Sequence, residues 1–258
     1  MNIYLYRIFV FAALLGVFLP SFTEAQKPNK NPKKTEITPA VKSQPKIESK
    51  TEPKTQSQNS KSPLSELDVA VIEEINLARG NPQKFVAYLE EYKKALKGNV
   101  LYLPNRPGIT MIEGAAAIDD AINELKKLSK FDALSTSNGL FRTANIQLTD
   151  LQEDSTLSHR GKDGSDLEKR LLKFGFAGLN TAENICYKES VAREVVMTMI
   201  LDDGLKNRPH RKNIFSRKFK QVGVSCGLNK KNEAICVAVF ADSFKENTFT
   251  VSSKTKEF

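Results

Sequence analysis

Histidine is almost missing from this sequence, which has only two in 258 residues. Neither lies in a His-Glu-x-x-His pattern, so the helical zinc-protease motif is excluded. Tryptophan is absent, and three cysteines are too few for a densely disulfide-bonded small domain. After residue 19, no apolar run approaches the roughly 20 residues of a membrane-spanning helix. We therefore expect no transmembrane segment in the mature protein.

The first 25 residues have the pattern of a secretory signal peptide. Arg7 precedes an apolar run over residues 8–19, which is normal for a signal peptide but too short for a bilayer core of roughly 30 Å. Thr23 and Ala25 place small residues where a signal peptidase cleaves. An uncleaved membrane anchor is the alternative interpretation. We expect residues 1–25 to be removed and the protein to be secreted, or periplasmic in a Gram-negative bacterium.

Residues 26–62 differ sharply in composition from the rest of the chain. They are rich in Lys, Pro, Ser and Thr, and such a segment buries too little apolar surface to offset the entropy of ordering, which predicts a disordered linker. With nine Lys and three Glu, this segment carries +6 of the chain's net +9. It is either a contact for an anionic surface or a solvated spacer. The remainder of the chain lacks a basic face with aromatic residues. We therefore expect no nucleic-acid binding.

Residues 63–247 have the size of one domain, and residues 248–258 form a C-terminal tail. A short strand is expected over 182–187, and a loop with an extended piece over 98–110. Ser65, Ser165 and Ser190 are the expected helix N-caps. Apolar residues at helical spacing predict helices over residues 64–77, 82–92, 115–128, 138–151, 165–174 and 190–201.

A β-hairpin is predicted near the C-terminus. Strands over 221–228 and 233–240 flank a polar loop, with Val222 opposite Phe240. Both faces of this hairpin are apolar, so each needs a covering layer. The pattern predicts an α+β fold in which helices cover both faces of a small antiparallel sheet.

The predicted register also sets Cys226 opposite Cys236, at a separation that a disulfide can bridge. Three cysteines in an exported chain leave one over. We therefore expect Cys226 and Cys236 to be joined and Cys186 to be a free, buried thiol on its apolar strand.

Four motifs follow one another along the domain. They are Ile75–Arg79 with Asn81–Pro82, Ser158–Ser165, Ala182–Ile185, and His210–Phe215 followed by Phe219–Val224. Together they resemble the CAP superfamily of cysteine-rich secretory, antigen 5 and pathogenesis-related proteins, and most of all its bacterial SCP-domain branch. The resemblance extends over Leu64–Phe244 and implies a three-layer α-β-α sandwich.

The resemblance also implies a cleft with two histidines and two acids. His159, His210 and Glu183 match the family positions, and Asp202 is the best match for the second acid, with Asp203 as its rival. Independently of the family, both histidines stand in polar, turn-rich loops beside acids. We therefore expect these side chains to share one cluster.

Such a cluster has more than one chemical interpretation. His159 and His210, as neutral imidazoles, suit Zn²⁺ or another divalent metal at about 2.0–2.1 Å, and a bound water could then act as a nucleophile. Alternatively, the acids and imidazoles form a hydrogen-bonded network that holds loops together. Ser158 and Cys186 are weaker candidates for a nucleophile. Arg211 is a surface or cleft cation expected to tie the His210 loop to a nearby carbonyl or acid.

Two functions remain open from the sequence. The first is a secreted binding or interaction module for a lipid, a glycan or a protein, with no required cofactor. The alternative is a metal-dependent hydrolase acting on peptide or cell-wall-derived substrates. Zinc retained by the protein, with turnover lost in His159→Ala, would favour the enzyme.

Overall fold

The structure, a computed structural model, describes residues 64–153 and 157–247. The predicted signal peptide (1–25) and linker (26–62) and the predicted tail (248–258) fall outside these residues. Within residues 64–153 and 157–247, no helix combines the length and apolar content needed to cross a bilayer.

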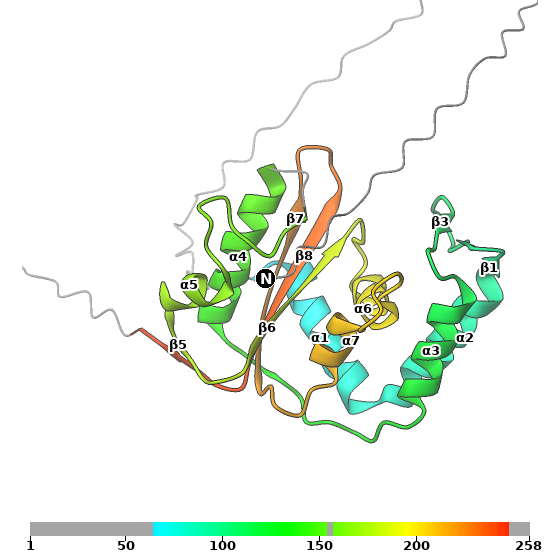
Figure 1. The fold of residues 1–258 in the computed structure, drawn as a ribbon, viewed down its shortest axis with the longest axis horizontal. Coiled ribbons are helices and arrows are strands. Elements are labelled where there is room, and N and C mark those ends of the chain that lie inside the picture. The colour runs from blue at the N-terminus through cyan, green and yellow to red at the C-terminus, as the bar shows by residue number, and fades with distance from the viewer. Residues whose placement is uncertain (1–63, 154–156, 248–258) are drawn as a thin grey trace, which may run out of the picture. The chain divides into compact units, whose positions relative to one another are not determined.

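Helices and short strands are mixed along the chain, and Figure 1 shows their arrangement. The helices are α1 (Glu66–Gly80), α2 (Pro82–Ala95), α3 (Ala115–Leu125), α4 (Asn138–Glu153), α5 (Leu167–Leu172), α6 (Ala192–Leu201) and α7 (Pro209–Ile214). The strands are β1 (Leu96–Lys97), β2 (Val100–Leu101), β3 (Ile109–Thr110), β4 (Ser135–Thr136), β5 (Gly175–Ala177), β6 (Thr181–Tyr187), β7 (Gln221–Leu228), β8 (Ala234–Ala241) and β9 (Phe244–Glu246).

The main sheet has the strand order β4-β7-β8-β6. Strands β7 and β8 form the predicted hairpin, with Val222 opposite Phe240 and Cys226 opposite Cys236. Strand β6 adds to the other edge of β8 in antiparallel fashion, whereas the two-residue β4 pairs with β7 in parallel. A three-stranded sheet β1-β2-β3 and a two-stranded sheet β5-β9 are separate from this sheet.

Alternate residues of β8 face two different apolar cores. Cys236, Ala238 and Phe240 pack with α1, α6 and α7, while Val237 and Val239 pack with α4 and α5. The fully buried strand therefore has one helical layer on each side, as Figure 1 shows. The predicted α+β, three-layer α-β-α sandwich is confirmed. The sheet has helices on both sides because the hairpin is apolar on both faces, as the sequence indicated.

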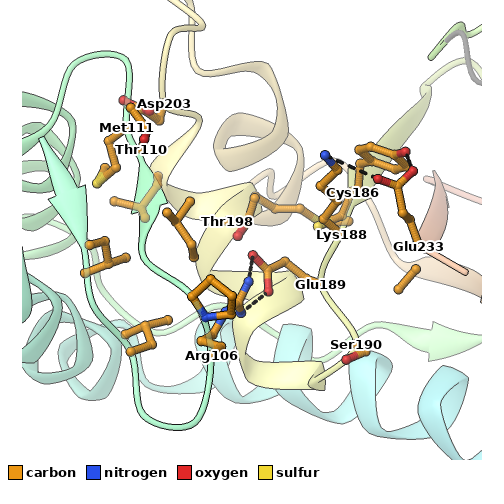
Figure 2. Close-up of a pocket in the computed structure, with 18 of the residues that line it drawn as sticks. Arg106, Thr110, Met111, Cys186, Lys188, Glu189, Ser190, Thr198, Asp203 and Glu233 are labelled. Carbon is orange, nitrogen blue, oxygen red and sulfur yellow. Dashed lines mark hydrogen bonds and ion pairs between the residues drawn. The ribbon is translucent and has the colours of Figure 1, made fainter. Parts of the chain in front are cut away.

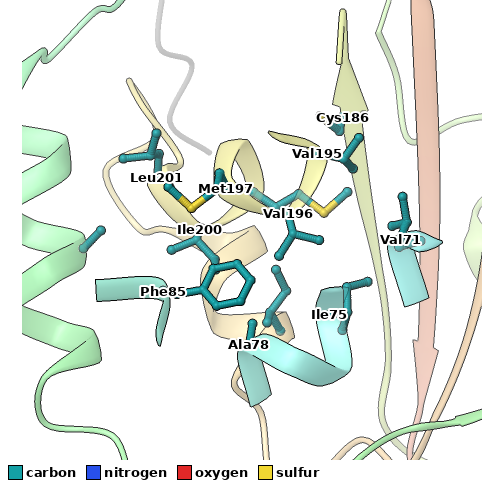
Figure 3. Packing of buried hydrophobic residues seen from close by; sticks show 14 of the residues in the cluster. Val71, Ile75, Ala78, Phe85, Cys186, Val195, Val196, Met197, Ile200 and Leu201 are labelled. Atoms are coloured by element: carbon teal, nitrogen blue, oxygen red, sulfur yellow. The ribbon is translucent and has the colours of Figure 1, made fainter. Parts of the chain in front are cut away.

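The larger core centres on α6, which is apolar on most of its surface. Val195, Val196 and Ile200 are completely buried there, and α1 and α2 contribute Ile75 and Phe85 (Figure 3). Burying such aliphatic side chains contributes about 1.5–3 kcal/mol each. This packing fixes the end of α6, where Asp202 lies.

One of the three predicted serine caps is observed. Ser65 forms a reciprocal capping box with Asp68 at the start of α1. For α5 the prediction is wrong, because Asp166 rather than Ser165 accepts the hydrogen bond from Lys169 N. Ser190 is also not a cap, since α6 begins after Val191 without a side-chain cap.

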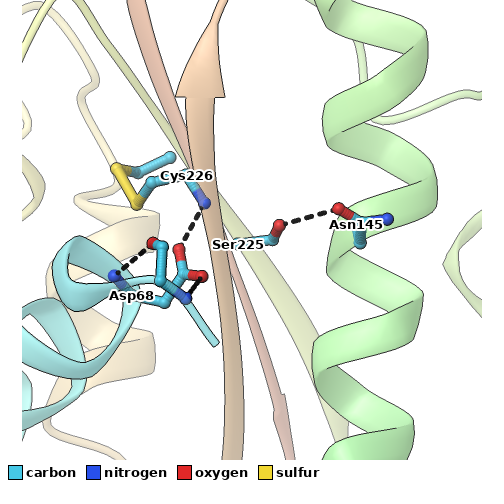
Figure 4. The surroundings of a disulfide bond; sticks show 6 residues. Asp68, Asn145, Ser225 and Cys226 are labelled. Carbon is cyan, nitrogen blue, oxygen red and sulfur yellow. Dashed lines mark hydrogen bonds between the residues drawn. A yellow bond between two sulfur atoms is a disulfide. The ribbon is translucent and has the colours of Figure 1, made fainter. Parts of the chain in front are cut away.

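Asp68 also connects α1 to the hairpin. Its Oδ1 accepts a hydrogen bond of 2.7 Å from the backbone N–H of Cys226, beside the Cys226–Cys236 disulfide (Figure 4). On the other face of β7, Ser225 donates to Asn145 of α4. Helices on both sides are thus hydrogen-bonded to adjacent residues of one strand.

Candidate functional site

Glu183 and His159 form the first pair of predicted site residues. Strand β6 buries Glu183, whose Oε1 lies 2.9 Å from Nδ1 of His159. The His159 side chain comes from the loop before α5 and is 61% exposed. This pair therefore has a buried acid and an imidazole open to solvent.

Arg170 is the partner that the sequence interpretation missed. Its side chain is completely buried and donates to Oε2 of Glu183 at 2.7 Å. It also donates to the carbonyl oxygens of His159 and Ser165. Arg170 thus neutralises Glu183 and fixes the His159 loop. Its position on the short α5, four residues after a helix cap, resembles an ordinary surface arginine, so no local signal identified it.

His210 and Asp202 form the second pair. Nδ1 of His210 lies 2.6 Å from Oδ1 of the buried Asp202, but without the alignment of a well-formed hydrogen bond. The other oxygen, Oδ2, accepts from the backbone N–H of Arg211 at 3.0 Å. Asp202 has a left-handed backbone conformation that ends α6, and His210 lies in the first turn of α7.

Arg211 ties this loop down, as expected, although its side chain is completely buried rather than at the surface. It donates to the carbonyl oxygens of Ile200 and Leu201 and to Asp120 and Glu124. These contacts hold α7 against the end of α6. The predicted link between the His210 loop and neighbouring carbonyls and acids is confirmed.

Asp203, the rival for the second acid, has a different environment. Its carboxylate accepts hydrogen bonds from the backbone N–H groups of Ile112 and Glu113. Glu113 in turn forms an ion pair with Arg208, whose hydrogen bond lowers the pKa of Glu113 to about 2. Asp203 therefore holds the segment before α3, and Asp202 is the acid beside His210.

The two pairs are connected to edge strand β6 in different ways. Glu183 contacts α5, whereas its neighbour Asn184 contacts Asn213 and the His210 carbonyl of α7. Successive strand residues point to opposite faces, which accounts for the different contacts of Glu183 and Asn184. Each acid thus has its own histidine partner, and a single cluster of all four side chains stays a prediction.

The grouping of acids and histidines bears on metal binding. Among residues 64–153 and 157–247, no group of three or more His, Cys, Asp or Glu side chains is placed to hold a metal ion. A catalytic zinc usually has three protein ligands, so the described residues do not fit such a centre. Each pair offers one imidazole and one carboxylate, and zinc binding stays a prediction.

A cavity of about 1160 Å³ opens beside the second pair. Its walls come from the segment between α2 and α3, the end of β6 with the following turn, and the last turns of α6. His210 and Asp202 form part of its lining, while most of the wall is apolar, including Leu103, Met111 and Met199. A concave, largely apolar cavity with a few polar groups is typical of a small-molecule site.

Arg106 connects two walls of the cavity (Figure 2). It forms ion pairs with Glu189, at 2.6 Å, and with Glu194 at the start of α6. Burial raises the pKa of Glu189, and the Arg106 hydrogen bond opposes that rise. The same hydrogen bond raises the pKa of Arg106. These contacts hold the segment between β2 and β3 against the turn after β6.

The other charged side chains of the wall also have partners within the chain. Lys188 pairs with Glu233 at 3.3 Å, and Asp203 accepts two backbone hydrogen bonds. Because these charged groups already have partners within the chain, an occupant would find mainly apolar contacts. Cys186 lines the same wall and is buried, which confirms the expected buried, free thiol. Burial also raises the pKa of this thiol.

The fold and the two acid–histidine pairs describe the domain, and comparison with known proteins shows which family it resembles. Residues 120–240 match the model of CAP, the cysteine-rich secretory protein family. The resemblance to the CAP superfamily is confirmed by this match, which includes three of the four motifs. The Ile75–Arg79 motif lies before the matched segment. No curated protein matched the sequence.

Three solved bacterial structures are similar to parts of the chain. An outer surface protein of Borrelia burgdorferi is 19% identical, covering 50% of this chain and 89% of that one, with a TM-score of 0.38. An extracellular SCP-domain protein of Bacillus anthracis is 18% identical over 59% of this chain and 43% of that one, with a TM-score of 0.34. A cysteine-rich secretory protein of Staphylococcus aureus is 16% identical over 50% of this chain and 38% of that one, with a TM-score of 0.32. The chain thus spans less than half of the latter two.

Proposed function

We propose that this chain is an exported binding module that holds a lipid-like molecule in the cavity beside His210. The observation that carries this proposal is the cavity itself, about 1160 Å³ in volume and with more apolar than polar surface on its wall. Burial of apolar ligand surface contributes about 25 cal/mol per Å², so an acyl chain gains affinity there without any charged contact.

The charges on the wall favour a lipid over a glycan. Glycan recognition needs free hydrogen-bonding groups, whereas Arg106 and Lys188 are engaged with acids of the same chain. His210, whose side chain is 17% exposed, is placed to meet the polar end of an amphiphile. Export is the second part of the proposal and rests on the apolar run and cleavage pattern of residues 1–25.

A fluorescent fatty-acid analogue tests the proposal directly. Saturable binding to the full-length mature chain is expected, with competition that strengthens as the unlabelled acyl chain lengthens from eight to about sixteen carbons. Thr198→Trp places a large side chain on the cavity wall and should weaken binding at least tenfold, about 1.4 kcal/mol. Val191→Trp is the matched control, because Val191 is exposed near the same helix but outside the cavity lining.

Two results would contradict the lipid proposal. One is the absence of saturable binding at any chain length, and the other is equal affinity in the two tryptophan variants. Binding of oligosaccharides but not fatty acids would instead indicate a glycan module. Turnover of ester or peptide substrates that is lost in His210→Ala would support the hydrolase alternative.

A further inference from the structure

The three cysteines stand in one row across the main sheet. Strand β8 places Cys236 in the middle, with Cys226 of β7 directly opposite on one side and Cys186 of β6 directly opposite on the other. All three side chains belong to the core on the α1 and α6 face of the sheet. The disulfide joins Cys226 to Cys236, and Cys186 is the free thiol.

The backbone hydrogen bonds show that Cys236 forms a different kind of antiparallel pair with each of the other two cysteines. The backbone N–H of Cys226 points away from β8 and donates to Asp68, and the two disulfide Cα atoms are 4.1 Å apart. Both features belong to a non-hydrogen-bonded antiparallel pair. The N–H and C=O of Cys236 therefore face β6, which makes Cys186 and Cys236 a hydrogen-bonded pair.

The second pair has a separation suited to a disulfide. Cα atoms of a hydrogen-bonded antiparallel pair are about 5.5 Å apart, which is within the usual range for a disulfide. Cys236 consequently has two partners within bonding reach, on opposite sides and on the same face. An incoming sulfur from Cys186 and a leaving sulfur on Cys226 would lie on opposite sides of the Cys236 sulfur, as in-line displacement requires.

We propose that this row is a thiol–disulfide exchange site in which Cys186 and Cys226 compete for Cys236. The Cys186 thiolate attacks the Cys236 sulfur, the Cys226–Cys236 bond breaks, and a Cys186–Cys236 bond forms. Cys226 leaves as a thiolate and takes up the proton that Cys186 released. The step conserves electrons and needs no external oxidant.

Exchange would move the free thiol from one environment to another. Cys186 lines the cavity (Figure 2). Cys226 of β7 is only partly buried and lies beside the start of α1 (Figure 4). Burial raises the pKa of the Cys186 thiol, which keeps its thiolate scarce and makes exchange slow. Cys236 can thus be bonded to either Cys226 or Cys186. The cysteine that is left as the free thiol depends on which of the two bonds is present.

Peptide mapping of the native full-length chain tests the proposal. Trypsin places the three cysteines in separate peptides, residues 174–188, 221–230 and 232–245. After long incubation with a trace of reduced glutathione and acid quenching, peptide 174–188 should be found linked to 232–245. Peptide 221–230 should carry the alkylating label. If native protein yields only the 221–230 to 232–245 link, the exchange proposal is overturned.

Two variants test whether a cysteine on β6 must lie on the same face of the sheet as Cys236 to form the bond. Cys226→Ser should form the Cys186–Cys236 bond under mild oxidation with glutathione disulfide. The control is Ile185→Cys combined with Cys186→Ser and Cys226→Ser, because Ile185 belongs to the core on the other face. It should form at least tenfold less of the corresponding link. Circular dichroism checks that both variants are folded, and equal linking in them would overturn the register argument independently of the wild-type mapping.

Discussion

At the scale of single residues, the His159–Glu183 pair depends on a third side chain. Glu183 is a buried carboxylate, and the completely buried Arg170 is the cation that neutralises it. A buried charge without its partner is expensive because it has lost its hydration. Arg170 therefore belongs to the support of the site, although its local sequence contains no sign of it.

Replacing Arg170 with Ala should lower the free energy of unfolding by about 3–5 kcal/mol, because Glu183 would remain buried and unpaired. Urea denaturation measures this loss. Lys94→Ala is the control, since Lys94 forms an exposed pair with Glu91 and its removal should change the stability much less than the Arg170 substitution does. Equal losses in the two variants would mean that Glu183 is protonated or hydrated.

The Glu113–Arg208 contact predicts how stability depends on pH. The Arg208 hydrogen bond lowers the pKa of Glu113 from 4.5 to about 2, so the folded state favours the ionised carboxylate. This contribution is complete above pH 4.5 and is lost as the pH falls towards 2. Glu113→Gln should therefore destabilise the protein at pH 6 but hardly at all near pH 2.

Urea midpoints of the wild type and Glu113→Gln from pH 2 to pH 6 check this prediction. The gap between the two proteins should open as the pH rises through the window from about 2 to 4.5. A gap that is independent of pH would attribute the effect of the substitution to packing.

At the scale of elements, helix α4 lies directly on strand β7. A Cβ atom at Gly223 would be 2.1 Å from the backbone N of Phe141 and 2.3 Å from the backbone C of Leu140. Helix and strand can approach this closely only because Gly223 has no side chain. Gly227, further along the same strand, would instead meet the end of the Gln152 side chain.

Gly223→Ala should therefore cost about 1–3 kcal/mol or more, because α4 must move away from the sheet. Gly227→Ala should cost clearly less, since the Gln152 side chain can rotate. Thermal and urea unfolding of the two variants provide the comparison. A larger loss at Gly227 than at Gly223 would contradict the predicted role of backbone contact.

At the scale of the whole molecule, the charge is unevenly distributed. Residues 26–62 carry +6 of the net +9, so this segment should dominate binding to an anionic matrix. Deleting it should abolish most retention on such a matrix and leave the circular dichroism of the domain unchanged. Retention of the intact chain should weaken with salt, because charges are screened over about 8 Å at physiological ionic strength. Unchanged retention after the deletion would place the basic surface on the domain.

Short-range patterns in the sequence were sufficient for much of the fold. The Ser65 cap and the start of α2 at Pro82 follow from residues only a few positions apart. The hairpin register follows from two neighbouring strands joined by one short loop. Alternating apolar residues on both faces of the hairpin required a layer of helices on each side. The order of the four motifs was sufficient to indicate the resemblance to the CAP superfamily, because it needs no spatial information.

Only the tertiary structure decided how the candidate site is assembled. The partners of Glu183 and Asp202 come from different elements, and β6 is an edge strand with helices on both faces, so neighbouring residues point to separate surroundings. The sequence determined that acids and histidines stand in matching motifs. It did not determine the face of the sheet, the buried Arg170, or the Arg106 contacts across the cavity, because these depend on packing between segments distant along the chain.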